Sequence, residues 1–109
     1  MEASINRPLT TGDRLWADAH SRAEIQVGGG MARMNEGTSV SVLNLDDRVT
    51  QLQLTQGTLN VGVRRLAPGQ VFEVDTPNLA FSLRQPGEYR IEVDPDRDAT
   101  TIYMRKRKN

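Results

Sequence analysis

Apolar and polar residues alternate with a period of two through most of this sequence, and this pattern constrains the fold more than any other feature. The alternation is clearest in residues 23–27, 59–63 and 89–93. In a β-strand, successive side chains point to opposite faces of the sheet, so each run predicts a strand with one buried and one exposed face. Further runs of the same kind occupy residues 40–42, 52–54, 72–74 and 79–83.

Helical patterns are nearly absent from the sequence. The best candidate is Leu15–Arg22, a short segment for which we consider one helical turn or an irregular loop. Turn signals rich in Gly, Pro, Asn and Asp follow one another at intervals of about eight to twelve residues. We therefore expect an all-β fold of short strands, arranged as a twisted β-solenoid-like roll or a small sandwich.

The phase of the alternation changes at Gly57. Apolar residues fall on even positions in residues 52–54 and on odd positions in residues 59–63. A change of one residue turns the apolar side of a strand to the other face, unless a bend or bulge absorbs it. We predict that Gly57 is the bend, because glycine adopts backbone angles that other residues avoid. A similar slip in residues 42–45 predicts a bulge.

Composition limits the classes of protein that the chain can belong to. Its 109 residues fit a single domain, residues 1–109, and its 14 basic residues balance its 14 acidic ones. No overall field therefore attracts nucleic acid. The absence of cysteine excludes disulfides and thiol catalysis. No stretch approaches the ~20 apolar residues of a transmembrane helix, and residues 1–10 show no signal peptide.

Four segments, in order, carry a family pattern. They are the "PLTTGDRL" opening, the strand and glycine turn of Arg22–Gly30, the pair Gly37–Leu45 and Leu52–Val63 that contains "LTQGTLNVGV", and the segment "VFEVDTPNLAFSLRQPGEYRIEVD". The Thr76-Pro77 pair after an alternating strand is the best marker. Together they resemble the FecR-like domain, named for the ferric-citrate regulator of Gram-negative bacteria, over Leu9–Val93.

The resemblance implies an all-β domain in the periplasm or cell envelope. Family members that regulate iron transport also carry an inner-membrane helix and a cytoplasmic anti-sigma segment, and neither is in this sequence. Residues 85–88 depart from the family pattern, which often has a Gly-Thr pair there. Residues 101–109 end where the family leads us to expect another strand and turn, which would leave the domain truncated at its C-terminus.

Two aromatic residues are the candidate ligand-binding positions. Trp16 is the single tryptophan and follows Leu15 near the start of an expected strand. It is interpreted first as a core anchor and alternatively as a platform for a ligand. If the domain binds carbohydrate, we expect the sugar to stack on Trp16 and Tyr89.

No pattern in the sequence predicts a catalytic centre, a cofactor or a metal site, and we expect no enzyme. His20 is the single histidine and is interpreted as a loop residue. The strand carboxylates all fall on the polar phase, so we expect them to be exposed and ionised; they are Glu24, Glu73, Glu88 and Glu92.

Two further motifs have simple interpretations. Asp94, Asp96 and Asp98 are spaced as in a calcium loop, but Ala99 and Arg105 stand where an EF-hand has Gly and Glu. They are interpreted as a solvated acidic turn, with a weak cation site as the alternative. Gly28–Gly30 lacks the lysine and the following helix of a phosphate loop, and is interpreted as a turn.

These observations favour a non-catalytic recognition or regulatory module of the bacterial envelope, which contacts another envelope protein through a surface or a strand edge. The polar faces of residues 22–26 and 51–53 are candidate contact surfaces. Sensing the signalling domain of a transporter, as a sigma regulator does, is the most specific version of this hypothesis. The alternative is a glycan- or cell-wall-binding module. The sequence predicts no partner identity and no oligomeric state.

Overall fold

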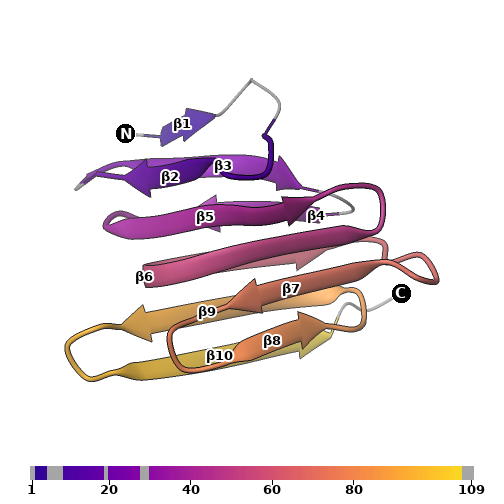
Figure 1. Cartoon of the computed structure of the whole chain (residues 1–109). Helices are drawn as coiled ribbons and strands as arrows, with labels where there is room; N and C mark the ends of the chain where they lie inside the picture. The colour runs from indigo at the N-terminus through magenta and orange to yellow at the C-terminus, as the bar shows by residue number, and fades with distance from the viewer. Residues whose placement is uncertain (1, 5–8, 19, 28–29, 107–109) are drawn as a thin grey trace.

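The computed structural model describes residues 2–4, 9–18, 20–27 and 30–106, and these ranges contain strands but no helix (Figure 1). The strands are β1 (Glu2–Ser4), β2 (Arg14–Ala17), β3 (Arg22–Val27), β4 (Gly30–Met34), β5 (Thr38–Leu45), β6 (Val49–Val63), β7 (Val71–Asp75), β8 (Ala80–Leu83), β9 (Gly87–Asp94) and β10 (Ala99–Lys106). The all-β prediction is confirmed.

The strands form two layers that share β6. One layer, the A sheet, has the order β1-β3-β4-β6-β9-β10, and the other, the B sheet, has the order β2-β5-β6-β7-β8. All neighbours are antiparallel except the pairs β1·β3 and β6·β7. Figure 1 shows β5, β7 and β8 of the B sheet in front of β4, β9 and β10 of the A sheet. The sheet is thus curled on itself, as expected for a small roll or sandwich.

The long strand β6 crosses from one layer to the other at Gly57. Its first half pairs with β5 and β7, and its second half, from Gly57 to Val63, pairs with β9. The φ angle of Gly57 is +96°, which L side chains rarely adopt. The predicted bend is therefore confirmed. Before the bend, β6 buries even-numbered residues such as Leu52 and Leu54. After the bend it buries odd-numbered residues such as Leu59 and Val61, and both sets lie in the same core.

The core between the layers is aliphatic. The largest fully buried side chains come from both sheets, and each adds about 1.5–3 kcal/mol of hydrophobic stabilisation; they include Ile25, Met34, Leu52, Leu54, Leu59, Leu83 and Ile91. Thr38 is also fully buried, and its hydroxyl both accepts from the Thr58 amide and donates to the Thr58 carbonyl, each at 3.0 Å. This threonine therefore anchors the start of β5 to the bend of β6.

Two local predictions have different outcomes. In β5, Val42 pairs with Leu52 and Asn44 pairs with Gln51, so Leu43 is an extra residue and the predicted bulge is confirmed. The helical turn considered for Leu15–Arg22 is wrong. Residues 14–17 form β2 and Arg22 begins β3, because Leu15 and Ala17 bury their side chains with a period of two.

Candidate functional site

A flat polar surface covers the outer side of the B sheet. The pairing register aligns Ser41, Gln53, Asp75 and Ala80 in one row across four strands, and Asn44, Gln51, Glu73 and Ser82 in the next. Trp16 on β2 lies beside Ser39 at one margin of this surface. We call this surface the polar face; its residues are Trp16, Ser39, Ser41, Gln51, Gln53, Glu73, Asp75 and Ser82.

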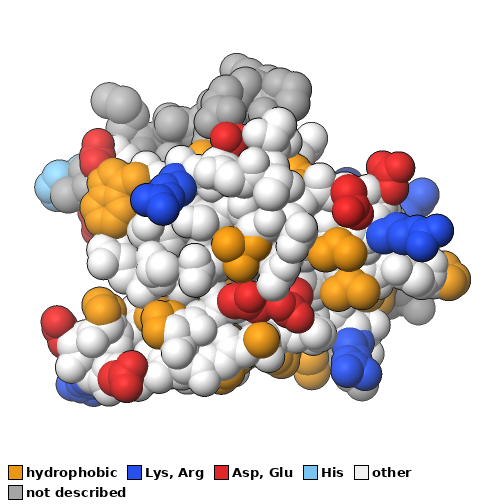
Figure 2. Space-filling model, in the orientation of Figure 1, with side chains coloured by type: hydrophobic (Ala, Val, Ile, Leu, Met, Phe, Trp, Pro, Cys, Tyr) orange, Lys and Arg blue, Asp and Glu red, His pale blue; other side chains and the backbone are white. Residues whose placement is uncertain are grey.

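The acidic charge of the polar face is concentrated on β7, and one basic residue, Arg14, lies opposite Ser41 at its β2 margin. Figure 2 shows a mostly uncharged surface with an acidic patch over β7. This patch contains Glu73 and Asp75, which point to the same side because they are two residues apart in a strand. The side-chain nitrogen of Gln51 donates to both carboxylates, at 2.8 Å each. Gln51 on the neighbouring strand β6 thus holds the Glu73 and Asp75 carboxylates side by side.

Glu73 is half-buried, unlike the exposed carboxylate expected from the sequence. Its hydrogen bond with Asp75, its partial burial and the charge of Asp75 together raise the pKa of Glu73, and the Gln51 amide opposes this shift. One oxygen of Asp75, Oδ1, is buried and has no hydrogen-bond partner among the described residues. The spacing of two residues in a strand was the sequence signal that could have identified this pair.

Trp16 is not the core anchor that the first interpretation expected. Its side chain is 54% exposed, because its neighbours Leu15 and Ala17 occupy the inward positions of β2. The indole nitrogen donates to the Asp18 carboxylate at 2.5 Å. The ring is therefore held at the margin of the polar face and remains accessible, as a ligand platform would require.

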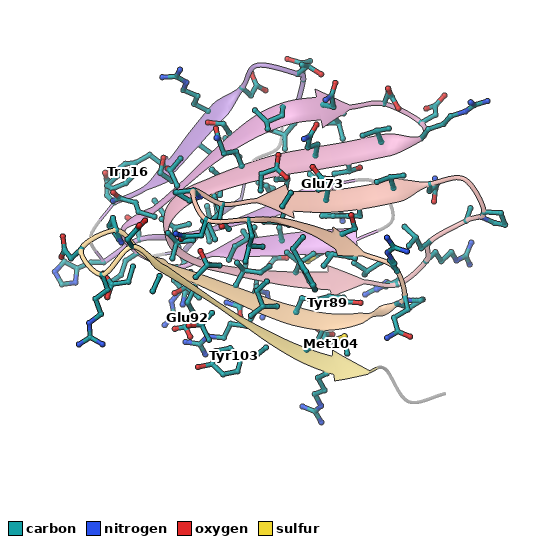
Figure 3. All side chains as sticks on the ribbon, turned by 60° about the horizontal axis from the view of Figure 1, so that its bottom comes forward. Trp16, Glu73, Tyr89, Glu92, Tyr103 and Met104 are labelled. Atoms are coloured by element: carbon teal, nitrogen blue, oxygen red, sulfur yellow. The ribbon has the colours of Figure 1, made fainter. Side chains whose placement is uncertain are left out.

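Tyr89 lies in the core, away from the polar face. It is 3% exposed, its hydroxyl donates to the Gln85 carbonyl at 2.6 Å, and its ring meets Phe81 edge-on with centroids 6.2 Å apart. Burial raises the pKa of the Tyr89 hydroxyl. Figure 3 shows Trp16 and Tyr89 on separate strands in different parts of the molecule. The structure does not bring the two aromatic candidates together.

The remaining candidates form turns. His20 lies in the turn between β2 and β3, where its backbone amide donates to Glu36 at 2.6 Å. Asp94 closes the β9–β10 turn by accepting from the amides of Asp96 and Arg97, and the Arg97 guanidinium lies 3.7 Å from its carboxylate. Within the described ranges, no group of three or more His, Cys, Asp or Glu is arranged to hold a metal ion. Of the Gly28–Gly30 turn, residues 28 and 29 lie outside the described residues.

Two surface clefts lie away from the acidic pair. A cleft of about 460 Å³ at the corner of the roll is lined by the β6 bend and the β9–β10 turn, including Glu92 and Arg97. A second, of about 340 Å³, lies beside Asp46 and Phe72. Neither of these two clefts is lined by Glu73 or Asp75.

Comparison with known proteins gives one family. The family model described as "FecR protein" matches residues 13–105, which extend from the start of β2 to the end of β10. No curated protein and no solved structure matches the chain significantly. In the part of the chain that the structure describes, no helix is long and apolar enough to cross a membrane.

Proposed function

Because the chain belongs to the FecR protein family, we propose that it is a non-catalytic recognition module of the bacterial envelope, which acts through protein–protein contact and uses the polar face as its contact surface. The family match over residues 13–105 supports a role related to FecR-type signal transduction. We place the domain on the periplasmic side of the envelope. A sigma-regulator role, in which it senses the signalling domain of a transporter, is the most specific form of this proposal.

The polar face is the observation that carries the proposal. It combines an exposed tryptophan, a ladder of uncharged polar side chains and one compact acidic pair. Tryptophan is among the residues that contribute most to protein interfaces, and an isolated acidic pair selects a partner with a basic surface. Trp16 and the pair Glu73–Asp75 therefore define the two ends of the expected contact.

The open position of the acidic pair favours binding over catalysis. General acid–base chemistry depends on carboxylates that are shielded from water within a cleft. Glu73 and Asp75 lie on a flat strand surface, and Gln51 already occupies the donor position between them. We infer that this pair serves as a recognition element.

Site-specific photo-crosslinking tests the proposal. A photo-reactive amino acid is placed at Gln53 on the polar face, and a matched one at Asn60, which lies on the same strand but on the A sheet. Both proteins are irradiated in a Gram-negative envelope extract. We expect a saturable protein adduct at position 53 that weakens with Trp16→Ala, and none at position 60. Equal labelling at both positions, or none at position 53, would contradict the proposal.

A glycan-binding module remains the second candidate, because Trp16 is exposed beside polar groups. In this version a sugar ring stacks on the indole. Co-sedimentation with peptidoglycan is the measurement. Retention that falls several-fold in Trp16→Ala and is kept in Trp16→Phe, without any protein adduct at position 53, would favour glycan binding over protein contact.

A further inference from the structure

The strand β10 presents the longest unpaired edge among the described strands. It pairs with β9 over its whole length, from Ala99 opposite Asp94 to Lys106 opposite Gly87, and with no other described strand. The other edge strands with described side chains, β2 and β8, have only four residues each. On the side away from β9, every second residue of this eight-residue strand directs its backbone donor and acceptor outward. Such an edge is a template for pairing with another strand.

The side chains of β10 suit a covered edge better than a solvated one. Ile102 packs partly against the core, and Met104 on the same side is 52% exposed. Tyr103 on the opposite side is 55% exposed. Figure 3 shows Tyr103 and Met104 on the outermost strand of the molecule, with no strand beyond them. The middle of this edge is therefore apolar and uncharged.

The charges at the two ends of β10 have opposite sign. The turn before the strand contains Asp96 and Asp98, both exposed, whereas the strand ends with Arg105 and Lys106. Two copies in antiparallel orientation would bring the basic end of each strand beside the acidic turn of the other. Two copies in parallel orientation would place Arg105 against Arg105, which is destabilising. The charge pattern is thus self-complementary in one orientation.

We propose that a second copy of this chain pairs with β10 antiparallel, about a two-fold axis at Ile102, so that the A sheet continues through both copies. In this register Met104 lies opposite Thr100 of the second copy, Tyr103 opposite its Thr101, and Lys106 opposite its Asp98. The chain has a formal net charge of zero, so no general repulsion opposes the contact. This inference goes beyond the proposed function and does not rest on it, because the polar face lies on the other sheet.

Sedimentation of the whole chain tests the self-association. A single strand edge buries less area than the ~1,200 Å² of a stable interface, so concentrations from ~10 µM to ~1 mM are needed. We expect a reversible dimer that Met104→Lys shifts at least tenfold toward monomer. The matched control is Val71→Lys, which changes an exposed apolar residue on the B sheet and should leave the dimer unchanged. Monomer throughout the range, or equal effects of both variants, would overturn the proposal.

Cysteine cross-linking tests the register. The chain has no cysteine of its own, so single variants Thr101→Cys and Tyr103→Cys, one of them with an affinity tag, can be mixed. Residues directly opposite in an antiparallel pair have Cα atoms ~4.5–5.5 Å apart, which is within disulfide range. The mixture should form the mixed disulfide several-fold faster than either variant forms its own. Faster cross-linking through Asn60→Cys, in the middle of the A sheet, would instead place the contact away from β10 and refute the register.

Discussion

The change Gly57→Ala tests whether the fold depends on the bend of β6. Gly57 has a φ angle of +96°, and an added Cβ would lie 2.6 Å from the Cα of Thr38 and 2.9 Å from the carbonyl oxygen of Gly37. It would also overlap the Thr38 hydroxyl. Because two of these atoms belong to the backbone, relief requires a shift of β5 relative to β6.

The expected loss of stability has two parts. A non-glycine residue held at a sparsely populated positive φ costs about 1–3 kcal/mol, and overpacking in a close contact costs about 1–3 kcal/mol more. We therefore expect Gly57→Ala to lower the free energy of unfolding by roughly 2–6 kcal/mol. A domain of this size has a total of only about 5–15 kcal/mol, so the variant should be severely weakened or unfolded.

The control variant separates the two parts. Gly12 has a φ angle of +98°, but nothing lies within 4 Å of the position of its Cβ. Gly12→Ala should therefore lower the free energy of unfolding only by the cost of its positive φ angle, without the steric cost. Urea unfolding followed by far-UV circular dichroism measures the stability of both variants. If Gly57→Ala is ~2 kcal/mol less stable than Gly12→Ala, its urea midpoint should be lower by about 1 M. Equal losses in the two variants would refute the steric argument at Gly57.

Three further predictions concern hydrogen bonds and pH. Thr38→Val should cost about 1–3 kcal/mol because it leaves the partly buried Thr58 amide without its acceptor, and Thr38→Ser should restore most of this in urea unfolding. Tyr89→Phe should cost about 0.5–1.5 kcal/mol, since the ring still packs on Phe81; a loss above that of a cavity-forming Tyr89→Ala would contradict this reasoning. The pKa of Glu73 is raised in the folded chain, so the folded state holds its proton more tightly. Its stabilising contribution is complete below the unfolded pKa, near 4.5, and is lost as pH rises through the folded pKa. Glu73→Gln should therefore unfold at higher urea than the natural chain at neutral pH and lose this difference at acidic pH; an unchanged difference would refute the shift.

Alternation along the sequence predicted the bend and the strands β3 and β5–β9, but it did not predict β1, β2, β4 or β10. The burial of one side of each strand forces apolar residues to recur every two positions, so the phase change at Gly57 had to mark a bend or a bulge. Leu15–Arg22 was harder to interpret, because the β2 segment is only four residues long. Two apolar positions separated by Trp16 do not distinguish a short strand from a helical turn.

The candidate site was less predictable because it depends on pairing between distant segments. Glu73 and Gln51 meet only because β6 and β7 pair in parallel with Gln51 opposite Glu73. Nothing local in either segment specifies that register. The position of Trp16 depends in the same way on which residues of β2 face the core. The burial of Tyr89 depends on the packing of β9 over Phe81. The sequence could identify these residues as candidates, but it could not predict which of them lie close together in the fold.

The crossing of β6 also separates the two contact regions that we propose. Before the bend its outward side chains, Gln51 and Gln53, belong to the polar face, and after it the outward residue Asn60 belongs to the A sheet, whose far edge is β10. A variant at the bend should therefore impair partner binding and self-association together, because both depend on the relation between the layers. Trp16→Ala should impair only partner binding, and Met104→Lys should impair only self-association. If either surface variant reduced both activities without unfolding the chain, the two regions would have to form a single interface.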